Sequence, residues 1–288
     1  MSPNMTGVVL MIASMACFTL NDTLIKLTDG AVPLMQLLFL RGVLSSLLIL
    51  MLARYLRALH FNIARRDWVL IGIRSVAEVG AAYFFITALL NLPLANVTAI
   101  LQVLPLTVAV GAALFFGEPL GWRRMAAILL GFIGMLLIVR PGAEGFSIWS
   151  LYALIAVACV TVRDLVTRKL TPGVPSMTVT FVAAVTVMLF AGVASTATEW
   201  VPITPRLAVL IGGASVLIIG AYFFSVRVMR IGEITLIAPF RYTGLIWALV
   251  LGWVVFDDWP SALTLLGAGI VVATGLFTLY RERALSKR

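Results

Sequence analysis

The chain has a single histidine, His60, and only two cysteines, Cys17 and Cys159, among its 288 residues. Structural zinc sites are built from clustered His and Cys, and histidine is the commonest acid-base catalyst, so neither kind of site is expected. The sequence also lacks the phosphate-binding motif G-x-x-x-x-G-K-[ST], which excludes nucleotide hydrolysis by that means. No metal and no organic cofactor is predicted.

Charged residues are scarce as well. They make up 11% of the chain against 62% hydrophobic residues, and the mean hydropathy is +1.10. A water-soluble domain cannot build a polar shell from this composition, so the lipid bilayer is the expected environment. The net charge of +9 would suggest a nucleic-acid partner in a soluble protein. Here the basic residues sit in short connections between apolar stretches, where membrane orientation explains them better, and no nucleic-acid partner is predicted.

Long apolar runs are abundant, and they have the length of roughly 20 residues that a helix needs to cross hydrocarbon about 30 Å thick. They predict an all-α integral membrane protein with ten transmembrane helices in one compact membrane domain. The predicted helices span residues 5–27, 33–53, 68–90, 94–116, 122–140, 146–166, 177–198, 207–228, 234–256 and 261–280. The first run continues into the bundle, so we expect a retained helix and no cleaved signal peptide.

The basic residues are divided unevenly between the two ends of this predicted bundle. If the amino terminus is cytoplasmic, fifteen Lys and Arg lie on the cytoplasmic side and three on the other, while Arg41, Arg74 and Arg241 lie inside helices. Positively charged connections are retained in the cytoplasm, so both termini are predicted to be cytoplasmic. The fifteen are Arg54, Arg57, Arg65, Arg66, Arg123, Arg124, Arg163, Arg168, Lys169, Arg227, Arg230, Arg281, Arg283, Lys287 and Arg288, and the three are Lys26, Arg140 and Arg206.

The sequence repeats itself at a distance of 142 residues. Ala16, Cys17, Thr19, Asp22 and Pro33 recur as Ala158, Cys159, Thr161, Asp164 and Pro175, and residues 82–85 recur as 221–224 with a slightly different offset. Division into a first repeat, 1–142, and a second, 143–288, places five helices in each. Because five is an odd number of membrane crossings, the second repeat enters the membrane in the opposite orientation to the first. Inverted repeats are typical of transporters whose central site opens to each side in turn, and the alternative is a duplication that merely built a stable bundle.

Short sequence motifs before the fifth and tenth predicted helices resemble those of a known family. Gly117-Glu118-Pro119 precedes the fifth predicted helix, Phe256-Asp257-Asp258 precedes the tenth, and glycines are spaced along both of these helices. With the helix count, the charge pattern and the repeats, the chain resembles the drug/metabolite transporter superfamily, EamA type, and within it the bacterial amino-acid exporters of the YddG type. The resemblance implies a bacterial inner-membrane protein able to act as a monomer. It also implies a central cavity lined by the first, third, fourth, sixth, eighth and ninth helices.

Ionisable side chains inside the predicted helices are the main functional candidates, because charge in hydrocarbon costs several kcal/mol unless it faces a partner or a water-filled cavity. Glu78 lies near the midplane of the third helix and is the best of them. Arg74 precedes it by one turn, so an ion pair and an unpaired, proton-exchanging carboxylate both stay open. Arg41 or Arg241 could hold a substrate carboxylate or bond to backbone carbonyls at a broken turn, and Arg241 is favoured because the family cavity includes its helix. Tyr83 and Tyr222 are then predicted near the substrate's side chain.

The repeated carboxylates, Asp22 and Asp164, lie near opposite faces of the membrane. Each is followed one turn later by a basic residue, Lys26 or Arg168, at a spacing that favours an ion pair. Gating pairs and ordinary salt bridges at helix ends are both open interpretations of this pattern.

Two prolines, Pro105 and Pro239, interrupt the fourth and ninth predicted helices, which correspond between the repeats. Proline removes a backbone hydrogen bond and frees a carbonyl. A bend that takes part in transport and a static kink both fit this pattern. Gln102 and Tyr242, close to these prolines, complete the predicted cavity residues.

The predicted function is secondary or facilitative transport, exporting amino acids, aromatic ones among them, or similar small metabolites. The expected partners are a small-molecule substrate and the lipid bilayer, and no catalytic residue is assigned. Two other classes stay open, a membrane-embedded enzyme acting on lipid-linked substrates and a non-transporting scaffold subunit. Flux of unmodified solute in sealed liposomes would exclude both.

Overall fold

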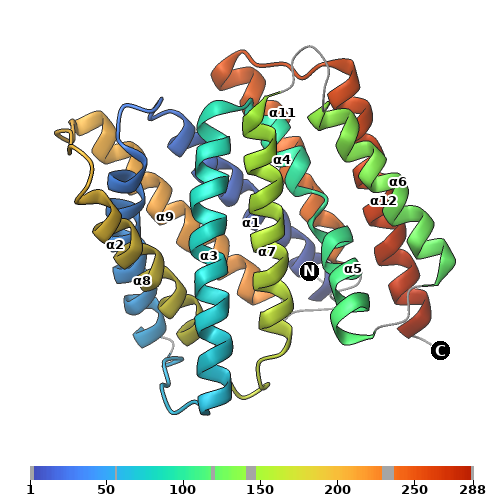
Figure 1. Cartoon of the computed structure of the whole chain (residues 1–288), viewed down its shortest axis with the longest axis horizontal. Coiled ribbons are helices and arrows are strands. Elements are labelled where there is room, and N and C mark those ends of the chain that lie inside the picture. Colours follow the sequence, from blue (N-terminus) through green and yellow to red (C-terminus); the bar gives the residue numbers. More distant parts are fainter. Residues whose placement is uncertain (1–2, 56, 118–120, 141–146, 229–236, 287–288) are drawn as a thin grey trace.

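The computed structural model describes residues 3–286 except 56, 118–120, 141–146 and 229–236, and it is helical, without strands, over that part of the chain (Figure 1). Its elements are α1 (Pro3–Lys26), α2 (Leu34–Tyr55), α3 (Arg65–Asn91), α4 (Leu94–Leu101), α5 (Leu104–Phe116), α6 (Trp122–Val139), α7 (Ile148–Arg168), α8 (Ser176–Ser195), α9 (Pro205–Val228), the 3-10 helix η1 (Ala238–Tyr242), α11 (Thr243–Phe256) and α12 (Ala262–Ser286). Eight spans among the described residues are long and apolar enough to cross a membrane, and two shorter apolar helices, Met125–Val139 and Ala262–Thr278, bring the number to ten. The predicted all-α membrane fold with ten helices is confirmed.

Three sequence features lie outside the described residues. These are Glu118 and Pro119 of the first motif, the beginning of the ninth predicted helix at 234–236, and the proposed junction between the two repeats at residue 142.

Two of the ten helices are broken where the prolines predicted it. The span 94–116 divides into α4, which ends at Leu101, and α5, which begins at Leu104 with Pro105 in its first turn. In the ninth helix, η1 carries Pro239 in its first turn and runs directly into α11. Proline has no N–H to donate to the preceding turn, so it favours the start of a new helical segment.

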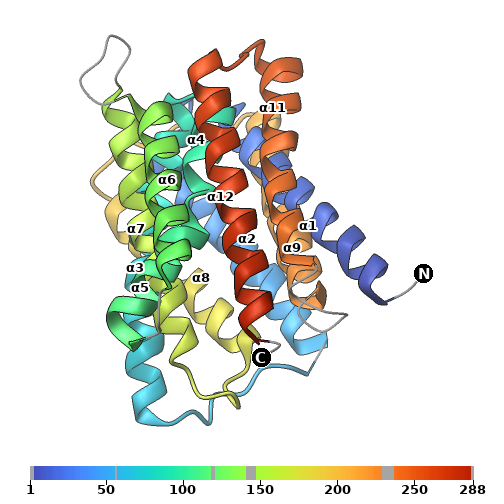
Figure 2. The same ribbon diagram turned by 90° about the vertical axis from the view of Figure 1, so that its right-hand side faces the viewer.

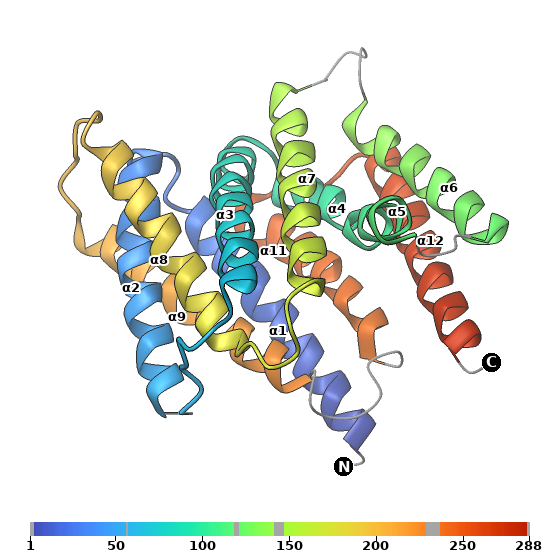
Figure 3. The same cartoon turned by 60° about the horizontal axis from the view of Figure 1, so that its bottom comes forward.

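Helices from the two halves of the chain pack in matching pairs. α3 packs along α7 and α1 along α9, so the third helix of each half contacts the first helix of the other. α2 packs on α8 and α6 on α12, which pairs the second helices and the fifth helices. Figures 1 and 3 show α2 and α8 at one edge of the molecule, α6 and α12 at the other, and α1, α3, α7 and α9 between them. The main contacts are therefore symmetric between the two halves: each helix contacts the counterpart of the helix that its own counterpart contacts.

Glycines allow α6 and α12 to approach each other closely. A Cβ added at Gly134 would lie 2.8 Å from the carbonyl oxygen of Gly267, and a Cβ added at Gly267 would meet the carbonyl oxygen of Gly134. Small residues let helices pack backbone to backbone in a membrane, where van der Waals contact has to replace the hydrophobic effect. Figure 2 shows the two helices side by side. This packing explains Gly134 and Gly267 among the spaced glycines of the two helices.

The buried apolar side chains gather toward one end of the bundle. The larger cluster includes Ile25 and Leu89, next to the α1–α2 and α3–α4 connections at the upper end of Figure 1. A much smaller cluster of Met11, Val228 and Ile237 lies toward the opposite end. The helices are therefore packed most extensively near the α1–α2 connection, and a cavity separates them farther along the bundle.

Candidate functional site

A cavity of about 460 Å³ lies between α1, α3, α4, α5, α7, α9, η1 and the first turn of α11, with one contribution from α2. Both halves of the chain line it, and both proline-broken helices reach it. Much of the wall is apolar, with side chains such as Phe18 and Phe85. The polar and charged lining residues are Thr19, Asn21, Asp22, Arg41, Glu78, Thr98, Gln102, Arg163, Asp164, Tyr222, Arg241 and Tyr242.

Glu78 forms two ion pairs in this cavity. Its Oε2 lies 3.6 Å from Nη2 of Arg74, one turn earlier on α3, and its Oε1 lies 3.3 Å from Nη1 of Arg163 on α7. The relative solvent exposure of the Glu78 side chain is 19%. Oε2 itself is buried and has no hydrogen-bond donor among the described residues. The structure therefore shows a paired Glu78 with one oxygen still able to accept a hydrogen bond.

Arg163 is a charged cavity residue that the sequence analysis missed. It was counted among the basic residues of the cytoplasmic side, but it lies within α7, is partly buried and lines the cavity. Its Nε donates to Oδ1 of Asp164 at 2.9 Å while its Nη1 contacts Glu78. The predicted helix 146–166 already contained position 163, and that was the available signal. The correction removes one of the fifteen cytoplasmic residues and leaves the charge asymmetry with the same sign.

Asp22 belongs to a polar chain that crosses from α1 to α2. Its Oδ1 accepts a hydrogen bond from Nδ2 of Asn21 at 2.8 Å, and Oδ1 of Asn21 accepts one from Nη2 of Arg41 at 3.2 Å. Asn21 thus joins the repeated carboxylate to a partly buried arginine. The expected ion pair between Asp22 and Lys26 is not formed among the described residues, which is a correction to the sequence-based prediction.

Lys26 instead caps the end of another helix. Its Nζ donates to the carbonyl oxygens of Leu89 at 3.1 Å and Leu92 at 2.7 Å, and lies 5.5 Å from the ring centroid of Phe256. The last carbonyls of a helix have no partner within it and attract a cation. Lys26 therefore joins α1 to the ends of α3 and α11 at the well-packed end of the bundle. Arg168, its counterpart, is exposed as the last residue of α7.

Replacing Lys26 with methionine should destabilise the protein by about 2 kcal/mol, the scale of losing hydrogen bonds from a charged donor. Methionine keeps the apolar stem but cannot donate to Leu89 and Leu92. The measurement is the melting temperature of the purified protein in detergent. Arg206→Met serves as the control, because Arg206 is exposed at the same end of the bundle. Equal melting temperatures for the two variants would contradict the capping role.

The remaining predicted cavity residues differ in how they meet the cavity. Tyr222 lines the cavity with its ring edge-on to Phe18, the centroids 5.6 Å apart, and Gln102 lines it from the turn between α4 and α5. Arg241 lines it but is exposed. Tyr242 borders the cavity, but its buried hydroxyl points toward α12, where Gly275 leaves room for it.

Tyr83 is a correction, because it is not among the described lining residues. On α3 the cavity meets Glu78, Ala82 and Phe85, which share one helical face. Position 83 is turned about 100° from position 82 on a helix with 3.6 residues per turn. Its ring packs against that of Phe84, with centroids 5.2 Å apart.

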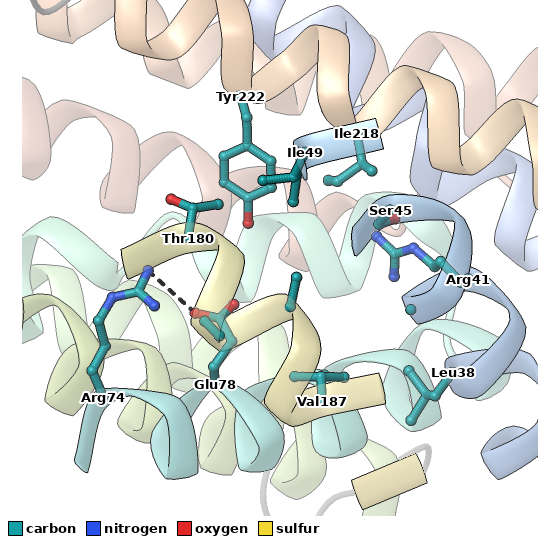
Figure 4. A pocket seen from close by; sticks show the side chains of 14 residues that line it. Leu38, Arg41, Ser45, Ile49, Arg74, Glu78, Thr180, Val187, Ile218 and Tyr222 are labelled. Carbon is teal, nitrogen blue, oxygen red and sulfur yellow. Dashed lines mark ion pairs between the residues drawn. The ribbon is translucent and has the colours of Figure 1, made fainter. Parts of the chain in front are cut away.

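A smaller pocket of about 110 Å³ extends from the site between α2, α3, α8 and α9 (Figure 4). It shares Arg41, Glu78 and Tyr222 with the larger cavity. Ser45 and Arg74 also line it. Figure 4 shows Arg41 and Ser45 on one side, Glu78 and Arg74 on another, and the Tyr222 hydroxyl directed between them.

The larger cavity and the smaller pocket, which share lining residues, contain charges of both signs. Their described lining residues include four arginines, Arg41, Arg74, Arg163 and Arg241, and three carboxylates, Asp22, Glu78 and Asp164. Four against three leaves one positive charge in surplus, and water can hydrate it because Arg241 is exposed. The other three arginines are partly buried beside the three carboxylates, so their charges balance.

Comparisons with known proteins show similarity to transporters. Residues 5–140 match the EamA-like transporter family. The S-adenosylmethionine uptake transporter of Rickettsia conorii is 26% identical over 288 residues, covering 99% of this chain and 96% of that protein. The pseudopaline exporter CntI of Pseudomonas aeruginosa is 26% identical over 291 residues, covering 96% and 97%. The riboflavin transporter of Rhizobium johnstonii is 24% identical over 200 residues, covering 69% and 66%.

A solved crystal structure has the same fold. It superposes with a TM-score of 0.65 at 18% sequence identity and covers 96% of this chain and 98% of its own. The likeness at this level of identity concerns the fold alone.

Proposed function

Because residues 5–140 match the EamA-like transporter family, we propose that this multi-pass membrane protein is a secondary or facilitative transporter that exports amino acids or similar small metabolites. The family and its relatives are transporters of small metabolites and not enzymes. The observation that carries the proposal is a charged cavity of about 460 Å³ inside an apolar ten-helix bundle. Ionisable groups at such a depth mark substrate and ion pathways.

The charge of the cavity supports the proposed substrate class. The arginines of the site suit a carboxylate, and the carboxylates beside them suit an amino group, so a zwitterion fits both. The apolar wall around Phe18 and Phe85 suits the remainder of such a molecule. S-adenosylmethionine, which the Rickettsia relatives take up according to their name, is itself an amino acid.

The proposed mechanism is alternating access between two inverted five-helix repeats. Two features support it: the reciprocal contacts of α1 with α9 and α3 with α7, and the breaks at corresponding places in the fourth and ninth helices. Broken helices beside a midplane site are typical of transporters built from inverted repeats. In this proposal the extensively packed end is the closed side, and Lys26 stabilises that closure.

The proposed orientation places both termini in the cytoplasm. A reporter that is active only in the periplasm should therefore be silent when fused after Arg288 and active when inserted after Pro202, in the connection between α8 and α9. A tag inserted after Gly142 should be accessible from outside intact cells. An active reporter at Arg288 would overturn the orientation and the inverted-repeat argument with it.

Transport is tested with purified protein in sealed liposomes and radiolabelled L-phenylalanine, L-methionine, S-adenosylmethionine and riboflavin. We expect saturable flux of an unmodified amino acid and none above background in protein-free liposomes. A chemically altered product would favour the enzyme class, and flux of riboflavin alone would remove the amino-acid assignment. Bacterial cells that express the protein should also lose preloaded amino acid faster than cells without it, because the proposed direction is export.

A further inference from the structure

The side pocket contains buried polar atoms that the protein itself does not satisfy. The Ser45 hydroxyl, Nη1 of Arg74 and Oε2 of Glu78 are buried without hydrogen-bond partners among the described residues, and all three residues line this pocket of about 110 Å³. A buried polar group without a partner costs about 1–3 kcal/mol, more when it is charged. Such atoms gathered around one pocket indicate a polar ligand that supplies the missing bonds.

Side chains of opposite charge, Arg41 and Glu78, lie on different sides of the pocket. Arg41 lines the pocket, and its described hydrogen bond uses only Nη2, to Asn21, so its other N–H groups can donate to a ligand. Ser45 adds a hydroxyl on the same side (Figure 4). Across the pocket, Oε2 of Glu78 can accept a hydrogen bond, since its contact with Arg74 is 3.6 Å long. The Arg41 side therefore fits a carboxylate, and on the other side Oε2 of Glu78 fits an ammonium donor beside the Nη1 donor of Arg74, which is unpaired among the described residues.

We infer that the side pocket is the subsite for the α-amino-carboxylate head group of the substrate, with Arg41 and Ser45 binding the carboxylate and Glu78 binding the ammonium. This inference rests on the proposed transport function. The rest of the substrate extends into the larger cavity, which shares Arg41, Glu78 and Tyr222 with the pocket. A carboxylate without an amino group would leave Glu78 Oε2 without a donor, and an amine without a carboxylate would leave Arg41 and Ser45 unused.

The inference changes the residue that anchors the carboxylate. Of the two arginines that the sequence offered, Arg241 was favoured over Arg41, but Arg241 is exposed and does not line the side pocket among the residues described there. Arg41 lines both spaces and is partly buried. A fixed guanidinium in a confined site gives an oriented contact that lysine does not reproduce.

Competition by matched analogues tests the subsite. In liposomes that transport radiolabelled L-phenylalanine, phenethylamine lacks the carboxylate and 3-phenylpropanoate lacks the ammonium. We expect each to compete at least about tenfold more weakly than unlabelled phenylalanine, the scale of one lost charged hydrogen bond. The same test applies to L-methionine with 3-(methylthio)propylamine and 4-(methylthio)butanoate. Equal competition by the amine would remove the Arg41–Ser45 half of the site, and equal competition by the acid would remove the Glu78 half.

Two neighbouring serines supply a matched pair of variants. The hydroxyls of Ser45 and Ser46 are both buried without a partner among the described residues, but only Ser45 is found in the pocket lining. Either Ser→Ala change removes an unsatisfied group and should leave folding intact. Ser45→Ala should weaken phenylalanine binding about tenfold and leave phenethylamine competition unchanged, while Ser46→Ala should change neither. Arg41→Lys should likewise weaken phenylalanine binding more than Arg241→Lys does.

The outcomes separate the subsite from the transport function. If the wild-type protein transports neither phenylalanine, methionine nor S-adenosylmethionine, the proposed function fails and the subsite with it. If it transports one of them but Ser45→Ala behaves like Ser46→Ala, or Arg241→Lys has the larger effect, the subsite is wrong and the transport function stands.

Discussion

Glu78→Gln is expected to lower the stability of the protein by about 2 kcal/mol, below the roughly 3–5 kcal/mol lost when one partner of a fully buried pair is removed. The change leaves Arg74 and Arg163 without their shared counterion. The loss is reduced because the Glu78 side chain keeps 19% of its exposure and is partly solvated. Thermal unfolding in detergent measures the effect.

The matched control is Glu199→Gln, since Glu199 is exposed in the connection between α8 and α9. Its melting temperature should stay within about 1 °C of the wild type, as surface substitutions change stability by less than about 0.5 kcal/mol. An unchanged melting temperature for Glu78→Gln together with lost flux would show that the carboxylate serves transport alone. In the proposed subsite it serves both, so flux per folded molecule should also fall.

Gly267→Val should have the largest structural effect, a loss of at least about 2 kcal/mol typical of severe overpacking. The new side chain would meet the carbonyl oxygen of Gly134 and lie 2.9 Å from Cγ1 of Ile138. A backbone carbonyl in α6 cannot move aside as the end of a flexible side chain does. The α6 and α12 helices would therefore have to separate, which thermal unfolding and the yield of folded protein should both report.

Gly269 offers the control two residues farther along α12. A Cβ added there meets nothing within 4 Å, so Gly269→Ala should be neutral or slightly stabilising through its higher helix propensity. Equal losses for the two variants would show that α12 tolerates no added side chain anywhere. That result would remove the close contact with α6 as the explanation.

The helical fold follows from local properties of the chain. Each apolar run of roughly 20 residues has to satisfy its own backbone hydrogen bonds in lipid, and only a helix does so within one segment. Pro105 and Pro239 break their helices because a missing N–H acts on the preceding turn of the same segment. These features depend on neighbours in sequence, and so they were predictable.

The site depended on how distant helices face one another. Arg163 meets Glu78 only because α7 packs along α3, 85 residues away in sequence. Lys26 has an acidic residue one turn earlier, yet the terminal carbonyls of α3 lie closer and need a donor. Tyr83 and Tyr222 occupy matching positions in the repeat, but only Tyr222 is found in the described lining, because the rotation of each helix sets which face is covered.

Composition, the length of the apolar runs and the two prolines by themselves therefore determined the membrane environment, the helices and their breaks. Tertiary structure decided which charges meet, which carbonyls are capped and where the cavity runs. The physical reason is range: backbone hydrogen bonding acts within a few residues, whereas ion pairs and close packing join groups from helices far apart in sequence, and their partners are chosen only when those helices pack.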